Sequence, residues 1–304
     1  MEAAFDYVIV GGGSAGSVLA GRLSEDPATA VCLLEAGGGG NSGFVNVPVG
    51  AVAMIPTKLN NWAFETVPQP GLGGRRGYQP RGRMLGGSSA INAMIYMRGH
   101  RSDYDHWAAL GNRGWSFDEV LPYFRLSEAN ERFDDEWHGR DGPLWVSDLR
   151  TQNPFHDRIL QAARQTGLPV TQDFNGAEQE GVGVYQVTQK EGERCSAARA
   201  YLFPHMGKRG NLHVETRTHV ARVVVEDGRA VGVETVGGGR RRFVRARREV
   251  VLSAGALQSP QVLMLSGIGP ADELKRLGIA PLVDLPGVGK NLQDHPDFIF
   301  GYRS

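Results

Sequence analysis

The first apolar segment of the chain, Tyr7–Val10, is short and rich in β-branched residues, which is typical of a strand covered on both faces. A glycine-rich turn follows at residues 11–16, and apolar residues then recur on one helical face, at Ala15, Val18, Leu19 and Leu23. A second apolar run, Val31–Leu34, ends at Glu35. The pattern predicts a strand–turn–helix–strand unit, the beginning of an α/β fold with a parallel sheet.

The rest of the pattern is less regular. Residues 37–43 are nearly all glycine and residues 60–83 are rich in Gly, Pro and Arg without periodicity, so both segments are expected to be loops. Helices are predicted at 103–110, 116–126 and 154–166, and two more begin near residues 259 and 269.

Residues 212–252 change to strand patterning, and their hairpin turn is predicted at Asp227-Gly228. The run Val250–Leu252 then enters a second turn of small residues, 253–256. Taken together, the elements predict a doubly wound α/β sheet of the Rossmann type with an inserted β-meander.

The first turn has the chemistry of a dinucleotide site. Gly11, Gly13 and Gly16 satisfy G-x-G-x-x-G; these glycines permit the tight turn, the approach of a pyrophosphate, and the close packing of helix on strand. Glu35 follows Gly16 by 19 residues, where a carboxylate accepts hydrogen bonds from ribose hydroxyls and repels a 2′-phosphate. NADP is therefore disfavoured, while NAD and FAD are not separated by this motif.

A second block of small residues runs from Gly86 to Asn92 and contains two glycines, two serines and an asparagine. Ser88 or Ser89 is expected to cap a short helix that carries Asn92. A capped core helix is the alternative, but such residues suit contact with a polar ligand better than a core. Together with the second turn at 253–256, the block favours a long, buried cofactor.

Composition narrows the picture. The chain has 304 residues, 41% of them hydrophobic and 22% charged, with 33 basic and 33 acidic residues, as expected of a globular protein without overall attraction to nucleic acid. The basic run Arg240–Arg248 is interpreted as a solvated strand face, with Phe243 and Val244 packing inward. Cys32 and Cys195 are expected to be reduced thiols, and no metal site is expected.

No targeting or membrane-spanning segment is expected, which makes the cytoplasm the default location and leaves peripheral membrane contact open.

Four strings together resemble the glucose–methanol–choline (GMC) family of FAD-dependent oxidoreductases. They are the first turn with Glu35, Gly82–His100, Gly255–Pro270 and Gly287–Pro296. The resemblance implies a glutathione-reductase-type FAD-binding fold in two segments, residues 1–150 and 192–304, with an incomplete substrate-binding domain at 151–191.

The resemblance also implies residues for each part of FAD. Those implied for the pyrophosphate and adenosine ribose are Gly11, Gly13, Ser14, Ala15, Gly16, Glu35 and Ala36. Those implied along the pyrophosphate, ribityl chain and flavin are Met84, Gly87, Ser88, Asn92, Ala93 and Met94. Trp62 and Val220 are implied at the adenine, and Ser253, Ala254 and Ser259 at the second turn. Some relatives attach the flavin through a histidine where this chain has Ile91, so the FAD is predicted to be non-covalent.

The implied reaction is the oxidation of a primary alcohol, such as choline or an aliphatic alcohol, to the aldehyde. Hydride passes to flavin N5 and electrons then pass to a quinone-type acceptor. The family's catalytic histidine is expected beyond Ser304, so none of the eight histidines is predicted to be catalytic. His295 is the most tempting of them, but a structural role is favoured. The alternatives are a non-catalytic FAD-binding fragment and, less favoured, an NAD-dependent dehydrogenase.

Overall fold

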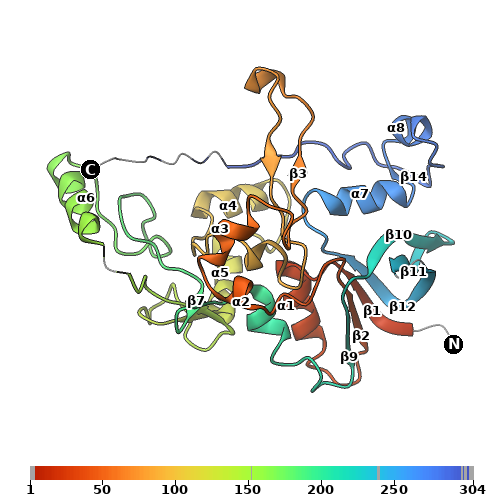
Figure 1. The fold of residues 1–304 in the computed structure, drawn as a ribbon, viewed down its shortest axis with the longest axis horizontal. Helices are drawn as coiled ribbons and strands as arrows, with labels where there is room; N and C mark the ends of the chain where they lie inside the picture. Colours follow the sequence, from red (N-terminus) through yellow and green to blue (C-terminus); the bar gives the residue numbers. More distant parts are fainter. Residues whose placement is uncertain (1–3, 152, 238–239, 296, 298–299, 301–304) are drawn as a thin grey trace.

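A six-stranded mixed sheet organises the computed structural model, which describes residues 4–151, 153–237, 240–295, 297 and 300. The strand order is β10-β11-β12-β1-β2-β9, and Figure 1 shows this sheet at one end of the molecule. Its strands are β1 (Ala4–Val10), β2 (Val31–Leu34), β9 (Leu212–Glu215), β10 (His219–Glu226), β11 (Arg229–Gly237) and β12 (Arg240–Leu252). Strands β12, β1, β2 and β9 are parallel, whereas β10, β11 and β12 are antiparallel.

The predicted meander is continuous with the parallel sheet rather than separate from it. The first part of β12 pairs antiparallel with β11, and its last part, from Arg245 to Leu252, pairs parallel with β1. Both Asp227 and Gly228 have positive φ angles, 50° and 76°, as a two-residue hairpin turn between β10 and β11 requires. The strand, meander and hairpin predictions are therefore confirmed.

Alternation along β1 and β2 divides the core between the two faces of the sheet. Val8, Val10, Cys32 and Leu34 pack against buried residues of the curled meander and of helix α7 (Gln258–Leu265). Ile9 and Leu33 pack on the opposite face, against helix α1 (Ser14–Leu23) and the π-helix η3 (Ala198–Leu202). Since both faces are covered, the central strands can be apolar throughout.

The basic run lies on β12 as expected, but only part of the packing prediction holds. Val244 is buried, whereas its neighbour Phe243 is half-buried and lies beside Gly232 of β11. Adjacent residues of a strand point to opposite faces, so the two could not both enter the same core. Nearby arginines pair with carboxylates, for example Arg247 with Asp6 at 3.1 Å.

Several short elements connect the sheet with the rest of the chain. The remaining helices are α2 (Gly43–Asn46), α3 (Gly50–Met54), α4 (Arg101–Ala109), α5 (Phe117–Ser127), α6 (Pro154–Gln165) and α8 (Ala271–Arg276), with 3₁₀ turns η1 (Pro70–Leu72) and η2 (Gly87–Ala90). The remaining strands pair as β3 (Phe64–Glu65) with β4 (Tyr78–Gln79), β5 (Glu128–Asn130) with β6 (Leu144–Val146), β7 (Gln189–Lys190) with β8 (Glu193–Arg194), and β13 (Ile268–Gly269) with β14 (Val283–Asp284).

The short helix predicted around Asn92 is wrong in form. It is only the 3₁₀ turn η2, it begins after Gly86 without a side-chain cap, and it ends before Asn92. The Ser89 hydroxyl donates to the Gly86 carbonyl at 2.6 Å instead of capping the helix, because a serine inside so short a turn reaches a local carbonyl first. The loop prediction for residues 60–83 also missed the β3–β4 pair.

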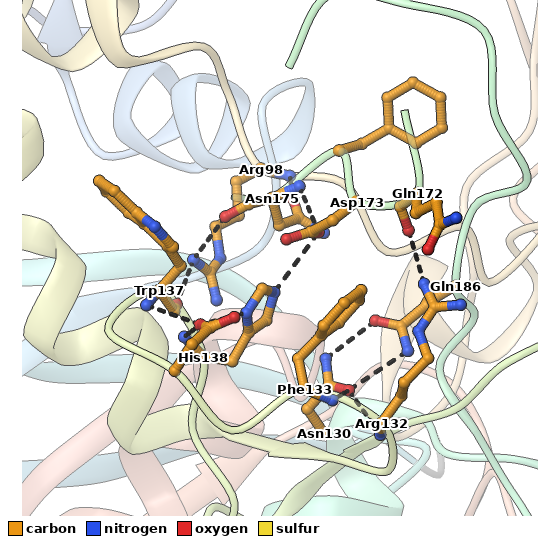
Figure 2. A network of polar contacts seen from close by, with 12 residues as sticks. Arg98, Asn130, Arg132, Phe133, Trp137, His138, Gln172, Asp173, Asn175 and Gln186 are labelled. Carbon is orange, nitrogen blue, oxygen red and sulfur yellow. Dashed lines mark hydrogen bonds and ion pairs between the residues drawn. The ribbon is translucent and has the colours of Figure 1, made fainter. Parts of the chain in front are cut away.

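A buried polar network holds together segments that are distant in sequence (Figure 2). Arg98 pairs with Glu128 at 2.6 Å, both nearly inaccessible, and its backbone N–H donates to Asn175 at 2.7 Å. Asn130 and Gln186 exchange side-chain hydrogen bonds in the same network. Such a network is tolerated in a core because its charges are paired, although the Nε of Arg98 is buried without a hydrogen-bond partner.

His138 extends this network toward the loop after α6. Its Nδ1 lies 2.8 Å from Asp135 and its Nε2 lies 3.5 Å from Asp173, while Phe133 stacks on the ring (Figure 2). Burial lowers the pKa of His138, but hydrogen bonds to Asp173 and Asp135 outweigh it and leave the pKa raised. The two carboxylates lie at opposite nitrogens of the ring, so His138 bridges Asp135 and Asp173.

Candidate functional site

A cleft of about 480 Å³ opens where β1, β2 and β12 end, at the carboxyl edge of the parallel strands. This is the edge at which ligands bind in open α/β sheets. Thirteen of the eighteen predicted site residues line it: Gly11, Gly13, Ser14, Ala15, Glu35, Ala36, Trp62, Gly87, Ser88, Val220, Ser253, Ala254 and Ser259. The tertiary structure therefore brings both small-residue turns and the acidic residue to one wall.

The glycines of the first turn have separate roles. Gly11 has a φ of +97°, and a Cβ there would lie 2.7 Å from the Ser253 carbonyl oxygen, so it lets the two turns touch. A Cβ on Gly16 would collide with the Gly11 carbonyl, so Gly16 lets α1 pack closely beneath the turn. A Cβ on Gly13 would meet nothing nearer than 3.9 Å, which leaves its face open to a ligand in the cleft.

Glu35 is held by the backbone of two glycine-rich loops. Its two carboxylate oxygens accept hydrogen bonds from the N–H groups of Gly12, at 2.8 Å, and Gly37, at 2.7 Å. Burial raises the pKa of Glu35, and these two hydrogen bonds oppose the rise. A carboxylate has about four acceptor positions, so two remain for the hydroxyl groups of a ribose.

Trp62, Phe64 and His219 also line the cleft and contact one another. Trp62 stacks on Phe64 with ring centroids 5.6 Å apart, and the Arg83 guanidinium lies 4.4 Å from the Trp62 ring centroid. His219 meets Trp62 edge to face, and burial together with the charge of Arg83 lowers the His219 pKa. Phe64 and His219 are not among the residues predicted from the sequence, although Phe64 lies two residues after Trp62 and His219 directly precedes Val220.

Five predicted site residues lie outside the lining of this cleft. Gly16 is buried beneath the turn, and Met84 is fully buried in a small core with Met54 and Ile91. Asn92 and Ala93 are exposed after η2, and Met94 is buried with a φ of 64°. Their proposed contacts with the flavin stay predictions.

The histidines are dispersed through the described part of the chain. His219 alone among them lines the cleft, and it lies beside Trp62 rather than beside η2. His295 is exposed, and its backbone N–H donates to Asp294. Cys32 and Cys195 are both buried and free, and burial raises the pKa of Cys32 to about 12.

The sheet, the glycine turn and the acidic residue at its edge define a dinucleotide-binding α/β domain. The family model of the GMC oxidoreductases matches residues 5–297. The chain therefore belongs to the GMC oxidoreductase family, and its fold is the FAD-binding fold of that family.

Curated and solved relatives agree with this assignment. The chain is 51% identical over 298 residues to the mitochondrial choline dehydrogenase of Homo sapiens and 49% identical over 296 residues to an alcohol dehydrogenase (acceptor) of Pseudomonas putida. Both matches use 96% of this chain but only 50% and 53% of the relatives, so the chain spans about half of their length.

Among solved structures, pyridoxine 4-oxidase from Mesorbium loti superposes with a TM-score of 0.91 at 40% identity. Formate oxidase from Aspergillus oryzae superposes with a TM-score of 0.89 at 32% identity. These matches cover 96% and 97% of this chain and 57% and 53% of the two relatives. None of the helices in the described ranges has the length and hydropathy needed to cross a bilayer.

Proposed function

We propose that this chain is the FAD-binding part of an enzyme that oxidises a primary alcohol, choline or an aliphatic alcohol, to the aldehyde. One observation carries the proposal: Gly13, Glu35 and the turn at Ser253 line the same cleft. A Cβ on Gly13 would have no close neighbour, and the Glu35 carboxylate has acceptor positions left beyond its two backbone hydrogen bonds. The family membership and the names of the relatives support the type of reaction.

Residues that line the cleft are proposed to bind successive parts of FAD. Gly13, Ser14 and Ala15 are proposed to hold the pyrophosphate at the N-terminal end of α1, where backbone N–H groups are free. Glu35 is proposed to accept from the adenosine ribose, and Trp62 and Val220 to flank the adenine. Gly87, Ser88, Ser253, Ala254 and Ser259 also line the cleft and are proposed as further contacts.

FAD supplies the acceptor for a hydride from the alcohol carbon, and the protein binds and orients it. The FAD is proposed to be dissociable, because Ile91 is buried among apolar neighbours and carries no group that could form a bond to the flavin. We further propose the division into residues 1–150 and 192–304 for FAD and 151–191 for the start of a substrate domain.

The electron acceptor and the location follow as finer proposals. The name of the Pseudomonas putida relative includes an acceptor, and we propose a quinone or a similar carrier for this protein. A cytoplasmic protein in peripheral contact with the inner membrane would meet such a carrier.

A matched pair of glycine variants tests the cofactor proposal. Gly13→Ala adds a Cβ that has room in the free protein but projects toward the proposed pyrophosphate, whereas Gly39→Ala adds one at an exposed position with nothing within 4 Å. In titrations with FAD, Gly13→Ala is expected to weaken binding by about tenfold or more, since a contact between backbone and phosphate is lost. Gly39→Ala should bind as the parent does.

The free energy of unfolding without FAD serves as the control, and it should change by about 1 kcal/mol or less in both variants. Saturable FAD binding that is equal in parent and Gly13→Ala would contradict the placement of the pyrophosphate. An absence of FAD uptake by the folded parent would contradict the proposed function itself. If the absorption spectrum of the purified chain showed bound NAD instead of flavin, the result would favour the NAD-dependent dehydrogenase.

The second candidate is a non-catalytic FAD-binding fragment. It is favoured by the absence of a histidine near η2 in the described part of the cleft lining. Reduction of the bound flavin by choline would exclude it, whereas FAD binding without reduction is expected of this chain under both candidates.

A further inference from the structure

Arg194 is a buried cation without a carboxylate partner in the described part of the structure. Its side chain is among the largest that are fully buried, with 1% of the residue exposed. Burial lowers its pKa to about 10, so the guanidinium still carries its charge at neutral pH. Arg98, the other strongly buried arginine, is paired with Glu128 at 2.6 Å, which shows how this fold compensates a buried charge elsewhere.

Carbonyl oxygens surround the Arg194 guanidinium instead. Nη1 donates to the carbonyl oxygens of Ser89, at 3.2 Å, and Asn92, at 2.8 Å, and to the Asn92 side chain at 2.9 Å. Nε donates to the Val45 carbonyl at 3.1 Å. Nη2 is buried without a hydrogen-bond partner among the described residues, and a buried guanidinium that has no carboxylate beside it is costly.

The carbonyls held by Arg194 belong to the C-terminal end of η2 and the residues after it. The other end of η2 lines the cleft through Gly87 and Ser88. The turn is also tied to the nucleotide loop, because the Gly86 N–H donates to the Gly12 carbonyl at 2.7 Å. Arg194 therefore fixes, from its buried side, the turn that faces the proposed cofactor.

We propose that Arg194 is a positioning residue for the flavin, which holds the Ser89–Asn92 carbonyls in place and supplies an uncompensated positive charge behind the turn. This inference rests on the proposed function. Two-electron reduction of FAD adds two electrons and one proton, which leaves one negative charge on the ring system. A fixed positive charge in a low-dielectric surrounding stabilises that charged form relative to the neutral oxidised form. A side chain with a purely structural role would not affect this balance.

Two substitutions separate the geometry from the charge. Arg194→Lys keeps the charge but cannot reproduce the planar fork, so it should weaken FAD binding several-fold and leave the midpoint potential of the flavin nearly unchanged. Arg194→Met removes both functions, so it should weaken FAD binding further. It should also shift the equilibrium toward oxidised flavin by about tenfold, which is ~30 mV for a two-electron couple.

The control removes a buried arginine without changing the net charge. The double variant Arg98→Met with Glu128→Gln removes the compensated pair and should alter stability while the flavin potential stays at the parental value. The purified 304-residue chain is loaded with FAD and reduced with dithionite against a reference dye. FAD affinity and thermal unfolding without FAD are measured in parallel.

A parental potential in Arg194→Met would overturn the inference while leaving FAD binding, and with it the proposed function, intact. A shift of the same size in the Arg98 and Glu128 double variant would overturn it as well. If Arg194→Met does not fold, Arg194→Lys decides, because a parental FAD affinity in that variant would exclude the positioning role. If the parent chain does not bind FAD, that result contradicts the proposed function itself, on which the role of Arg194 rests.

Discussion

Glu35 shows how single residues at the edge of the sheet serve two purposes. Its carboxylate joins the loops that carry Gly12 and Gly37 while half of its acceptor capacity faces the cleft. Burial raises its pKa, so ionisation costs free energy in the folded chain as long as no ligand donates to it. A residue that is unfavourable without a ligand and has free acceptor positions is typical of a binding site.

This burial predicts a pH dependence. Because the folded-state pKa of Glu35 lies above its ordinary value, its contribution to stability is fully present below the ordinary pKa and is lost as the pH rises through the raised pKa. The free energy of unfolding of the parent minus that of Glu35→Gln should therefore fall from acidic to neutral pH. Urea titrations of both proteins without FAD measure the difference, and a difference that is constant or rises would contradict the burial effect.

Alanine at Gly11 should lower the stability of the fold, whereas alanine at Gly13 should weaken FAD binding. Gly11→Ala places a methyl group at a φ of +97° and 2.7 Å from the Ser253 carbonyl oxygen, so we expect a loss of about 2–3 kcal/mol in the free energy of unfolding. Urea unfolding without ligand measures the loss. Equal stability of the parent and Gly11→Ala would mean that the two turns do not need this contact.

At the scale of elements, three strands of the main sheet end at the cleft, while buried polar side chains connect less regular segments elsewhere in the chain. The Arg98–Glu128 pair and the Asn130–Gln186 pair connect the chain after η2 with β5 and with the loop after α6. His138 adds a bridge from Asp135 to Asp173, which lies in that loop. These segments have little regular structure, so side-chain hydrogen bonds replace the backbone ladder of a sheet.

The bridge that His138 forms between Asp135 and Asp173 predicts that the segments around these residues are more stable at acidic pH. The hydrogen bonds to Asp173 and Asp135 leave the His138 pKa raised despite burial, so its contribution is complete below the ordinary value of 6.5 and is lost as the pH rises through the raised pKa. His138→Asn should lack this dependence. Hydrogen exchange in residues 133–138 and 171–175 at two pH values, one on each side of that window, gives the comparison, and equal pH dependence in both proteins would contradict the bridge.

At the scale of the whole molecule, the cleft wall unites three distant parts of the chain. Gly11 with residues 13–15, residues 87–88 and residues 253–259 all line it, although more than 160 residues separate the last two segments. The chain nevertheless spans only about half of its curated relatives.

The described cleft predicts that the 304-residue chain binds FAD but oxidises alcohols poorly. A base with a pKa near neutrality must lie within hydrogen-bond distance of the alcohol, and His219, the histidine among the described lining residues, lies at the end assigned to adenine. Choline or an aliphatic alcohol, added without oxygen, should leave the visible flavin absorbance unchanged. Bleaching by either alcohol would contradict this prediction, and dithionite provides the positive control.

The sequence by itself determined the N-terminal strand–turn–helix–strand unit and the meander with its turn at Asp227-Gly228, and it indicated Glu35 as an acidic residue that the structure places in the cleft lining. These follow from local periodicity and from glycine conformations that few other residues adopt. Only the tertiary structure decided that η2 is a single turn, that Phe64 and His219 join the cleft, and that Arg194 lies uncompensated behind the turn. Those features depend on contacts between residues far apart in sequence, and the pattern along the chain does not contain the distances between them.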